Sequence, residues 1–242
     1  MDWHSRYTQQ AAWTRDLRLY LFDKAGLANT HRVLEVGCGT GAILRELVTT
    51  AALHGLDLNH AALAESRIHA PAASLVRGVA QSLPYANEAF DIVCCHFLLL
   101  WVRDPLQALL EMKRVTRSGG HIIAFAEPDY SKRIDQPNEL IRLGQWQTES
   151  LKRQGANPGL GSQLAESFFQ AGIPIRETGT IQGVTKEPSH EEWENEWAVI
   201  ESDLAGMVPE ADIQKMKLVD RRALEGGERV LHVPTYFAWG QV

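Results

Sequence analysis

The 242-residue sequence has few cysteines, no long apolar run and no excess of basic residues. Its three cysteines, Cys38, Cys94 and Cys95, are odd in number with two adjacent, which favours a reduced protein over a disulfide scaffold. The longest apolar run, residues 97–102, is far shorter than the roughly 20 residues of a membrane-spanning helix. The first ten residues are polar and lack the apolar core of a secretory signal. We therefore expect a cytoplasmic protein without a membrane span.

The charge balance also narrows the choice of partner. Acidic residues outnumber basic residues by 30 to 24, for a formal net charge of −6. This balance does not favour nucleic acid as a partner, and no Cys/His spacing resembles a metal site. Hydrophobic residues make up 45% of the chain, enough for a sizeable core. The sequence thus predicts a globular protein, and it leaves the oligomeric state open.

Short apolar runs alternate with helical stretches through the first half of the chain. Runs rich in Val, Ile and Leu that are separated by helices are typical of a parallel sheet covered on both faces. A leading amphipathic helix is expected at residues 9–24, with Trp13, Leu17, Tyr20 and Leu21 on one face. Strands are expected at residues 32–36, 52–57, 74–77, 90–95 and 120–127, and helices at residues 42–49, 59–69 and 105–115.

The pattern changes after Pro128. Helices are expected at residues 137–154 and 160–171, and a strand at residues 175–184. An acidic helix with Trp193 and Trp197 on one face follows, then another helix after Pro209, and a closing strand at residues 230–239. No linker is long enough to divide the chain, so residues 1–242 are predicted to form a single domain.

A glycine cluster is the most informative stretch. The apolar strand at residues 32–36 leads directly into Gly37, Gly39 and Gly41, and glycines permit a tight reversal and a close approach of a ligand to the backbone. Asp57 ends the second strand twenty residues after Gly37, and a carboxylate at that position can accept hydrogen bonds from ribose hydroxyls. With Ala42 as the last position the spacing also fits a dinucleotide fingerprint, which leaves an NAD(P)-dependent oxidoreductase open.

Four linked segments resemble class I S-adenosylmethionine-dependent methyltransferases. Residues 35–41 resemble their first motif, residues 54–59 their second, residues 82–93 their third motif and fourth strand, and residues 111–127 the helix and strand that follow. Residues 236–240 resemble the last strand of the family. The nearest group includes ubiquinone and menaquinone biosynthetic members. The resemblance implies an α/β, doubly wound, Rossmann-like mixed sheet, mostly parallel with an antiparallel last strand and helices on both faces.

The resemblance also assigns residues to the cofactor, S-adenosyl-L-methionine. Glu35 would hold the ammonium group, and the backbone of Gly37, Cys38 and Gly39 would line the methionyl part. Residues 1–29 would form a lid, residues 30–130 the cofactor-binding half, and residues 131–242 the substrate side.

The residues that the resemblance assigns to the nucleoside part of the cofactor follow the second strand and lie in the loop after the third strand. Asp57 would bind the ribose, and Leu58 would cover one face of the adenine. Ala80 and Gln81 would lie near the adenine edge. Members of the family often carry an acidic residue where this chain has Val79, so Gln81 or a backbone carbonyl would replace that contact. From the lid, Tyr7 would fold over the cofactor and Arg18 would pair with the methionyl carboxylate, unless Arg18 belongs to a solvated face.

The chemistry of methyl transfer points less clearly to catalytic residues. In-line transfer needs orientation and exclusion of water, and it needs a general base only when the nucleophile arrives protonated. His96, directly after the fourth strand, is counted among the cofactor-binding residues and is also the candidate base, although its backbone could equally shape the site. Glu127, and Asp129 with Tyr130, follow the fifth strand and are further candidates, with capping as the alternative for the carboxylates.

The predicted activity is methyl transfer to a small, apolar or aromatic acceptor. Trp146, Trp193 and Trp197 are candidates for lining the acceptor site, and core packing is their alternative. A non-catalytic S-adenosylmethionine-binding protein on the same scaffold is the second alternative to a methyltransferase.

Overall fold

The computed structural model describes residues 3–181 and 188–242, and its centre is a seven-stranded sheet in the order β3-β2-β1-β4-β5-β9-β7. Only β9 runs antiparallel to its neighbours in this sheet, and the other adjacent strands pair in parallel. The mixed sheet predicted from the sequence is therefore confirmed. The strands are β1 Arg32–Val36, β2 Ala52–Asp57, β3 Ser74–Arg77, β4 Phe90–Cys95, β5 Thr116–Pro128, β7 Ile175–Ile181 and β9 Thr235–Gln241.

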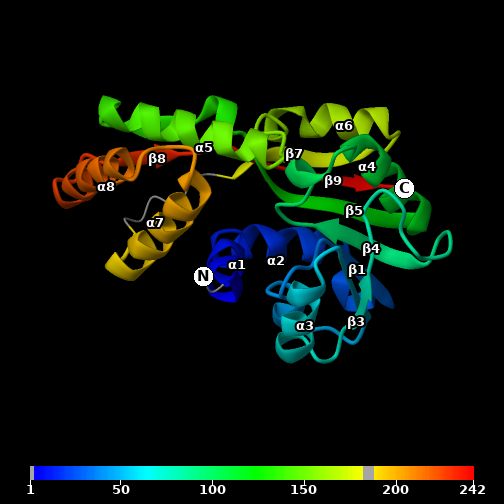
Figure 1. Ribbon diagram of the computed structural model, residues 1–242. Coiled ribbons are helices and arrows are strands. Elements are labelled where there is room, and N and C mark those ends of the chain that lie inside the picture. The colour runs from blue at the N-terminus through cyan, green and yellow to red at the C-terminus, as the bar shows by residue number, and fades with distance from the viewer. Residues whose placement is uncertain (1–2, 182–187) are drawn as a thin grey trace.

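Helices cover both faces of the sheet, as expected (Figure 1). On one face α2 (Arg15–Lys24) packs against β1, β4 and β5, and α3 (His60–His69) packs toward the edge strands β2 and β3. On the other face lie α4 (Pro105–Val115) and α6 (Leu164–Gln170). The adjacent cysteines illustrate the two layers, because Cys94 packs with the α2 layer and Cys95 with the α4 layer.

A second body, the helical cap, consists of α5 (Ile141–Arg153), α7 (His190–Leu204), α8 (Glu210–Glu225) and a two-stranded sheet of β6 (Ile134–Gln136) and β8 (Val230–His232). Figure 1 shows these elements together beyond one end of the large sheet, with α1 (Trp3–Trp13) beneath them. The cap has its own apolar core around Trp193 and Trp197. It is built from segments on either side of α6 and β7, so the cap does not fold from one continuous stretch.

The predicted leading helix at residues 9–24 is wrong in two respects. It is broken at Thr14 into α1 and α2, and the buried stripe runs through Ala11, Thr14, Arg18 and Leu21. Trp13 and Tyr20, which were expected on the buried face, are 40% and 44% exposed. Thr14 and Arg18 are buried because they bond to each other and to Ala11, which satisfies their polar atoms.

The predicted helix at residues 42–49 is also wrong, because only the 3₁₀ turn η2 (Leu44–Glu46) forms there. Ala42 and Ile43 pack against α1 instead, and Val48 is 97% exposed. The run of β-branched residues at 48–50 disfavours a helix. The other short 3₁₀ helices are η1 Leu27–Asn29, η3 Leu99–Trp101, η4 Tyr130–Lys132, η5 Asn138–Leu140 and η6 Gly161–Gln163.

The predicted closing strand at residues 230–239 is two strands, β8 and β9, in different sheets. Pro234 separates them, and proline cannot donate a ladder hydrogen bond. The strand predicted at residues 175–184 ends at Ile181, and its last three residues lie outside the described part of the chain. Among the described residues, the helices are all too short or too polar to span a bilayer.

Candidate active site

A cavity of about 690 Å³ opens where β1, β2 and β4 end. Its floor is the glycine turn after β1, and its walls come from the loops after β2, β3 and β4. The lid helix α1 closes one side with Trp3, Arg6, Tyr7 and Gln10, and the helical cap closes another. Ten of the eleven predicted cofactor residues line this cavity, namely Tyr7, Glu35, Gly37, Cys38, Gly39, Asp57, Leu58, Ala80, Gln81 and His96.

The glycine turn has the backbone geometry that its sequence requires. Gly37 has φ +77° and Gly39 has φ +51°, a region that is costly for residues with a Cβ. A Cβ on Gly37 would lie 2.7 Å from Leu98 Cδ1, and one on Gly39 would lie 3.1 Å from the ring of Tyr7. The amides of Gly37 and Cys38 both donate to Leu56 O, at 2.7 and 3.0 Å. The turn is thereby fixed to β2 and leaves its open side toward the cavity.

Glu35 is a buried carboxylate with an unsatisfied oxygen. Its side chain is 3% exposed and lines the cavity, yet its Oε2 has no hydrogen-bond partner among the residues that the structure describes. Burial raises the pKa of Glu35 to about 8, although Arg18 and the Leu44 amide act in the opposite direction. A buried carboxylate of this kind gains strongly from a cationic hydrogen-bond donor. The site therefore fits the ammonium group of an amino-acid ligand.

Asp57 joins the end of β2 to the glycine turn. Its Oδ2 accepts from the Gly39 amide at 2.8 Å, and its Oδ1 accepts from the Asn59 amide at 2.8 Å. A carboxylate has about four acceptor positions, so two bonds leave capacity for a pair of hydroxyl donors. The carboxylate lines the cavity beside the turn, which fits a ribose at this position.

The rim next to Asp57 is apolar and open. Leu58 is 61% exposed and Val79 is 41% exposed, although both line the cavity. Ala80 and Gln81 complete this wall, and the Gln81 carbonyl accepts a long hydrogen bond from Gln107 Nε2 at 3.5 Å. Two exposed aliphatic side chains beside a carboxylate suit a flat, apolar ring such as a purine.

Arg18 is the one predicted cofactor residue that the structure does not bring to the cavity. It is 3% exposed, and its guanidinium donates to Ala11 O, Thr14 Oγ1 and Glu46 Oε2. These three partners hold it beneath α1, an arrangement that does not support the predicted pairing with the methionyl carboxylate. Arg18 instead lies near Glu35 and favours its ionised form.

His96 lines the cavity but is not set up as a proton acceptor. Its Nε2 hydrogen-bonds with Thr14 Oγ1 at 2.9 Å, so the imidazole connects β4 to the junction of α1 and α2. Burial and the neighbouring Arg18 lower the pKa of His96 to about 3. A histidine with this pKa is neutral at physiological pH and weakly basic.

The two carboxylates at the end of β5, Glu127 within the strand and Asp129 directly after it, bind backbone amides. Glu127 is fully buried and accepts hydrogen bonds from the amides of residues 98–100, at 3.0, 2.8 and 3.1 Å. Burial nevertheless raises the pKa of Glu127 to about 7. Asp129 caps η4 through the Ser131 amide at 2.9 Å. Neither residue lines the cavity, and the capping alternative describes both.

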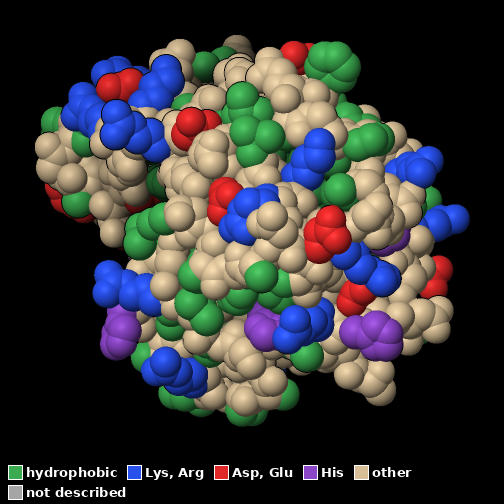
Figure 2. Space-filling model, turned by 90° about the vertical axis from the view of Figure 1, so that its right-hand side faces the viewer, with side chains coloured by type: hydrophobic (Ala, Val, Ile, Leu, Met, Phe, Trp, Pro, Cys, Tyr) green, Lys and Arg blue, Asp and Glu red, His purple; other side chains and the backbone are tan. Residues whose placement is uncertain are grey.

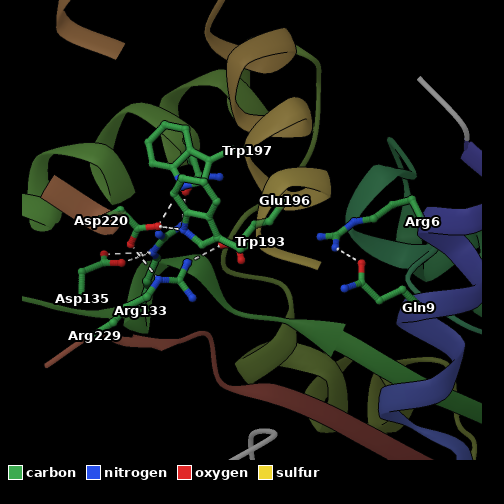
Figure 3. A network of polar contacts seen from close by, with 10 residues as sticks. Arg6, Gln9, Arg133, Asp135, Trp193, Glu196, Trp197, Asp220 and Arg229 are labelled. Carbon is green, nitrogen blue, oxygen red and sulfur yellow. Dashed lines mark hydrogen bonds and ion pairs between the residues drawn. The ribbon is translucent and has the colours of Figure 1, made fainter. Parts of the chain in front are cut away.

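The tryptophans proposed for the acceptor site belong to the core of the cap. Trp193 and Trp197 are fully buried, and both indole N–H groups donate to Asp220 Oδ2, at 2.6 and 2.8 Å (Figure 3). Trp146 packs on the same cluster and does not line the cavity. Core packing is therefore their observed role.

The cavity wall beneath the cap consists of residues that the sequence reasoning missed. They come from α1, the end of α5 and α7, which are distant in sequence, and no local motif marks them. The amphipathic pattern of α7 gave the one signal, because the helix face opposite its tryptophans turns toward the cavity. The missed residues are Arg6, Gln10, Leu151, Gln154, Val199 and Asp203, whereas Tyr130, expected after the fifth strand, also lines the cavity.

The methyltransferase-domain family matches residues 34–124, which contain the glycine turn, Asp57 and β4. Residues 34–124 are thus a methyltransferase domain, and the chain shares its fold with S-adenosylmethionine-dependent methyltransferases. The family match favours a methyltransferase over the oxidoreductase that the glycine spacing left open.

Among curated methyltransferases, the demethylmenaquinone methyltransferase of Renibacterium salmoninarum is 33% identical over 160 residues, covering 64% of this chain and 66% of that protein. A protein of Anabaena variabilis assigned as a methyltransferase of an antibiotic biosynthesis pathway shares the fold with TM-score 0.67 and 14% identity, covering 94% and 97% of the two chains. The [4+2]-cyclase SpnF also shares it, with TM-score 0.58 and 19% identity, covering 93% and 80%. The chain spans about half to two thirds of the length of the first curated relatives that it matches.

Proposed function

We propose that this protein transfers the methyl group of S-adenosyl-L-methionine to a small, apolar or aromatic acceptor. One observation carries the proposal: Glu35 and Asp57 line the same cavity on either side of the glycine turn. The unpartnered Oε2 of Glu35 suits the ammonium group, and the remaining acceptor positions of Asp57 suit the ribose hydroxyls. Leu58 and Val79 then border the purine.

Bound S-adenosylmethionine supplies an electrophilic methyl group on a sulfonium sulfur. The protein contributes the orientation of the two reactants and the exclusion of water, which can lower a barrier by about 7–11 kcal/mol. The lid residues Trp3 and Tyr7 and the cap residue Val199 close the cavity around the reaction. Because His96 is neutral and weakly basic, it serves as a hydrogen-bonding wall, and the acceptor enters with an available lone pair or ionises readily.

The acceptor class follows from the wall beneath the cap. Alongside its polar side chains, Phe97, Trp101, Leu151 and Val199 supply apolar surface, which suits an apolar or aromatic body. The curated relative from Renibacterium salmoninarum carries the name of a demethylmenaquinone methyltransferase, which supports a small-molecule acceptor. On the face shown in Figure 2, basic side chains lie among acidic and apolar ones, and the net charge is −6, so we do not propose a nucleic acid.

Calorimetric titration with S-adenosylmethionine, S-adenosylhomocysteine and NADH tests the cofactor. We expect the first two to bind and NADH to fail, and Glu35→Gln to weaken binding by about 1.5–3 kcal/mol through loss of a charged hydrogen bond. NADH binding alone would contradict the proposal.

A screen of extracted metabolites for release of S-adenosylhomocysteine tests turnover. We expect one class of small acceptor to release it. Cofactor binding without release for any acceptor would favour the non-catalytic alternative, and consumption of a metabolite without methylation would favour an activity such as that of the structurally similar [4+2]-cyclase.

A further inference from the structure

The end of the cavity beneath the helical cap holds two charged side chains from opposite walls. Arg6 comes from α1, and Asp203 lies near the end of α7. Figure 3 shows the Arg6 side chain extending from α1 toward α7, where Glu196 is located. The groups that act electrostatically on Arg6 are Glu196, Tyr130 and Asp203, whereas Glu35 is influenced by Arg18 and Asp57. Arg6 therefore belongs to the acceptor end of the cavity rather than the cofactor end.

The charge of Arg6 is not neutralised. Its Nη1 donates to Gln9 Oε1 at 2.8 Å, and its guanidinium carbon lies 5.1 Å from the centre of the Trp13 ring. No carboxylate within residues 3–181 and 188–242 forms an ion pair with it. Burial lowers the pKa of Arg6, and nearby acidic groups oppose this only in part. A partly dehydrated guanidinium without a carboxylate is favourable for an anionic ligand.

The acidic groups near Arg6 are engaged elsewhere. Glu196 pairs with Arg229 at 2.9 Å. Asp203 Oδ1 accepts from Gln154 Nε2 at 3.3 Å, and burial raises the pKa of Asp203. The same cavity also offers apolar side chains, among them Phe97, Leu151 and Val199.

We infer that Arg6 is an acceptor-binding residue, and that the methyl acceptor is an organic acid. Its carboxylate binds the guanidinium, and its apolar body packs against Phe97, Leu151 and Val199. Arginine suits this task because its planar fork can bind both carboxylate oxygens at once. The inference rests on the proposed function, since it names the acceptor class of the same cavity.

The test compares acids with their uncharged amides. Protein saturated with S-adenosylhomocysteine is titrated with 2-naphthoate and phenylacetate, and with 2-naphthamide and phenylacetamide, and binding is followed by NMR. In the wild type we expect each acid to bind about tenfold more tightly than its amide, or better. Arg6→Gln removes that preference. The matched control Arg15→Gln, an exposed arginine on α2 outside the cavity, keeps it.

A second variant, Asp203→Asn, removes a negative charge from the opposite wall of the cavity and tests whether Arg6 decides the preference for acids. Asp203→Asn takes away a negative charge that repels an incoming acid, so acids bind this variant at least as tightly as the wild type. If Asp203→Asn loses the preference for acids as fully as Arg6→Gln, Arg6 is not the deciding group and the inference falls.

A separate titration with S-adenosylhomocysteine distinguishes the two ways to fail. If the wild type does not bind S-adenosylhomocysteine, the proposed function falls and the inference falls with it. If the wild type binds S-adenosylhomocysteine but binds acids no better than amides, only the inference is overturned. The same holds if neither acids nor amides bind. Lower affinity of Arg6→Gln for S-adenosylhomocysteine with an unchanged acid preference would place Arg6 at the cofactor end and also overturn it.

Discussion

Glu35 of β1 and Asp220 of α8 are both buried carboxylates, 3% and 1% exposed, in two different regions of the molecule. Around Asp220, two indole N–H groups donate to Oδ2 and Arg229 Nε donates to Oδ1 at 2.7 Å (Figure 3). Glu35 lines the cavity, and within residues 3–181 and 188–242 its Oε2 has no hydrogen-bond partner. The satisfied carboxylate holds a core together, whereas the unsatisfied one leaves a binding capacity for a ligand. Burial alone therefore does not distinguish a structural carboxylate from a ligand-binding one. The hydrogen-bond partners of its two oxygens do.

The strongest test of this comparison is Asp220→Ala. The substitution leaves two buried indole N–H groups without an acceptor and leaves Arg229 with one carboxylate partner fewer. We expect the free energy of unfolding to fall by about 3–5 kcal/mol, the range for removing one partner of a buried ion pair. Urea unfolding followed by tryptophan fluorescence measures it. A loss below about 1 kcal/mol would show that Asp220 is no more important than a surface ion pair.

Whereas Asp220→Ala should lower the free energy of unfolding, Glu35→Gln should raise it. Because the folded-state pKa of Glu35 is raised from 4.5 to about 8, the folded protein keeps a proton that the unfolded chain releases. The contribution of Glu35 to the free energy of unfolding is therefore full below pH 4.5. It decreases as the pH rises to about 8 and stays low above that. Near pH 9 we expect the free energy of unfolding of the variant to exceed that of the wild type by up to about 5 kcal/mol.

Urea unfolding of both proteins across this pH range checks that prediction. Near pH 4.5 the two proteins should be almost equally stable. The raised pKa of Glu127, about 7, contributes to both curves and cancels in their difference. Parallel curves at all pH values would contradict the assignment of an uncompensated carboxylate to Glu35.

Asp57→Ala tests the other acidic group of the cofactor end. We expect the affinity for S-adenosylmethionine to fall by about 1–3 kcal/mol, the range for losing a buried hydrogen-bond partner. Asp57→Asn is the matched variant, since it keeps an oxygen that can accept from the Gly39 or Asn59 amide. Calorimetry measures both variants, and unchanged affinity of a folded alanine variant would remove Asp57 from the site.

The smallest effect is expected for Glu194→Gln on the outside of the cap. Glu194 pairs with Lys217 at 3.3 Å and with Arg221 at 3.1 Å, but its side chain is 40% exposed. Exposed ion pairs are worth about 0–1 kcal/mol, so thermal unfolding should shift little. A loss comparable to that of Asp220→Ala would mean that the charge network as a whole, and not Asp220, stabilises the cap.

Much of the sheet could be predicted because its signals are local. The strand at 32–36, the glycine turn and Asp57 lie within one stretch of the chain, and their spacing alone brings them to the same edge of a sheet. The helices at 42–49 and 9–24 were predicted less well, because burial of Arg18 and Thr14 depends on His96 and Glu46. No local pattern reports such partners.

The sequence by itself determined the succession of the first five strands of the large sheet and the glycine turn, since apolar periodicity and short-range spacing act between near neighbours in the chain. The tertiary structure alone decided that Oε2 of Glu35 lacks a partner in the described part of the chain, that Arg18 is held beneath α1, and that Arg6 lines the same cavity as residues of the cap. These outcomes depend on which polar groups from distant segments are left to satisfy one another after the apolar faces have packed.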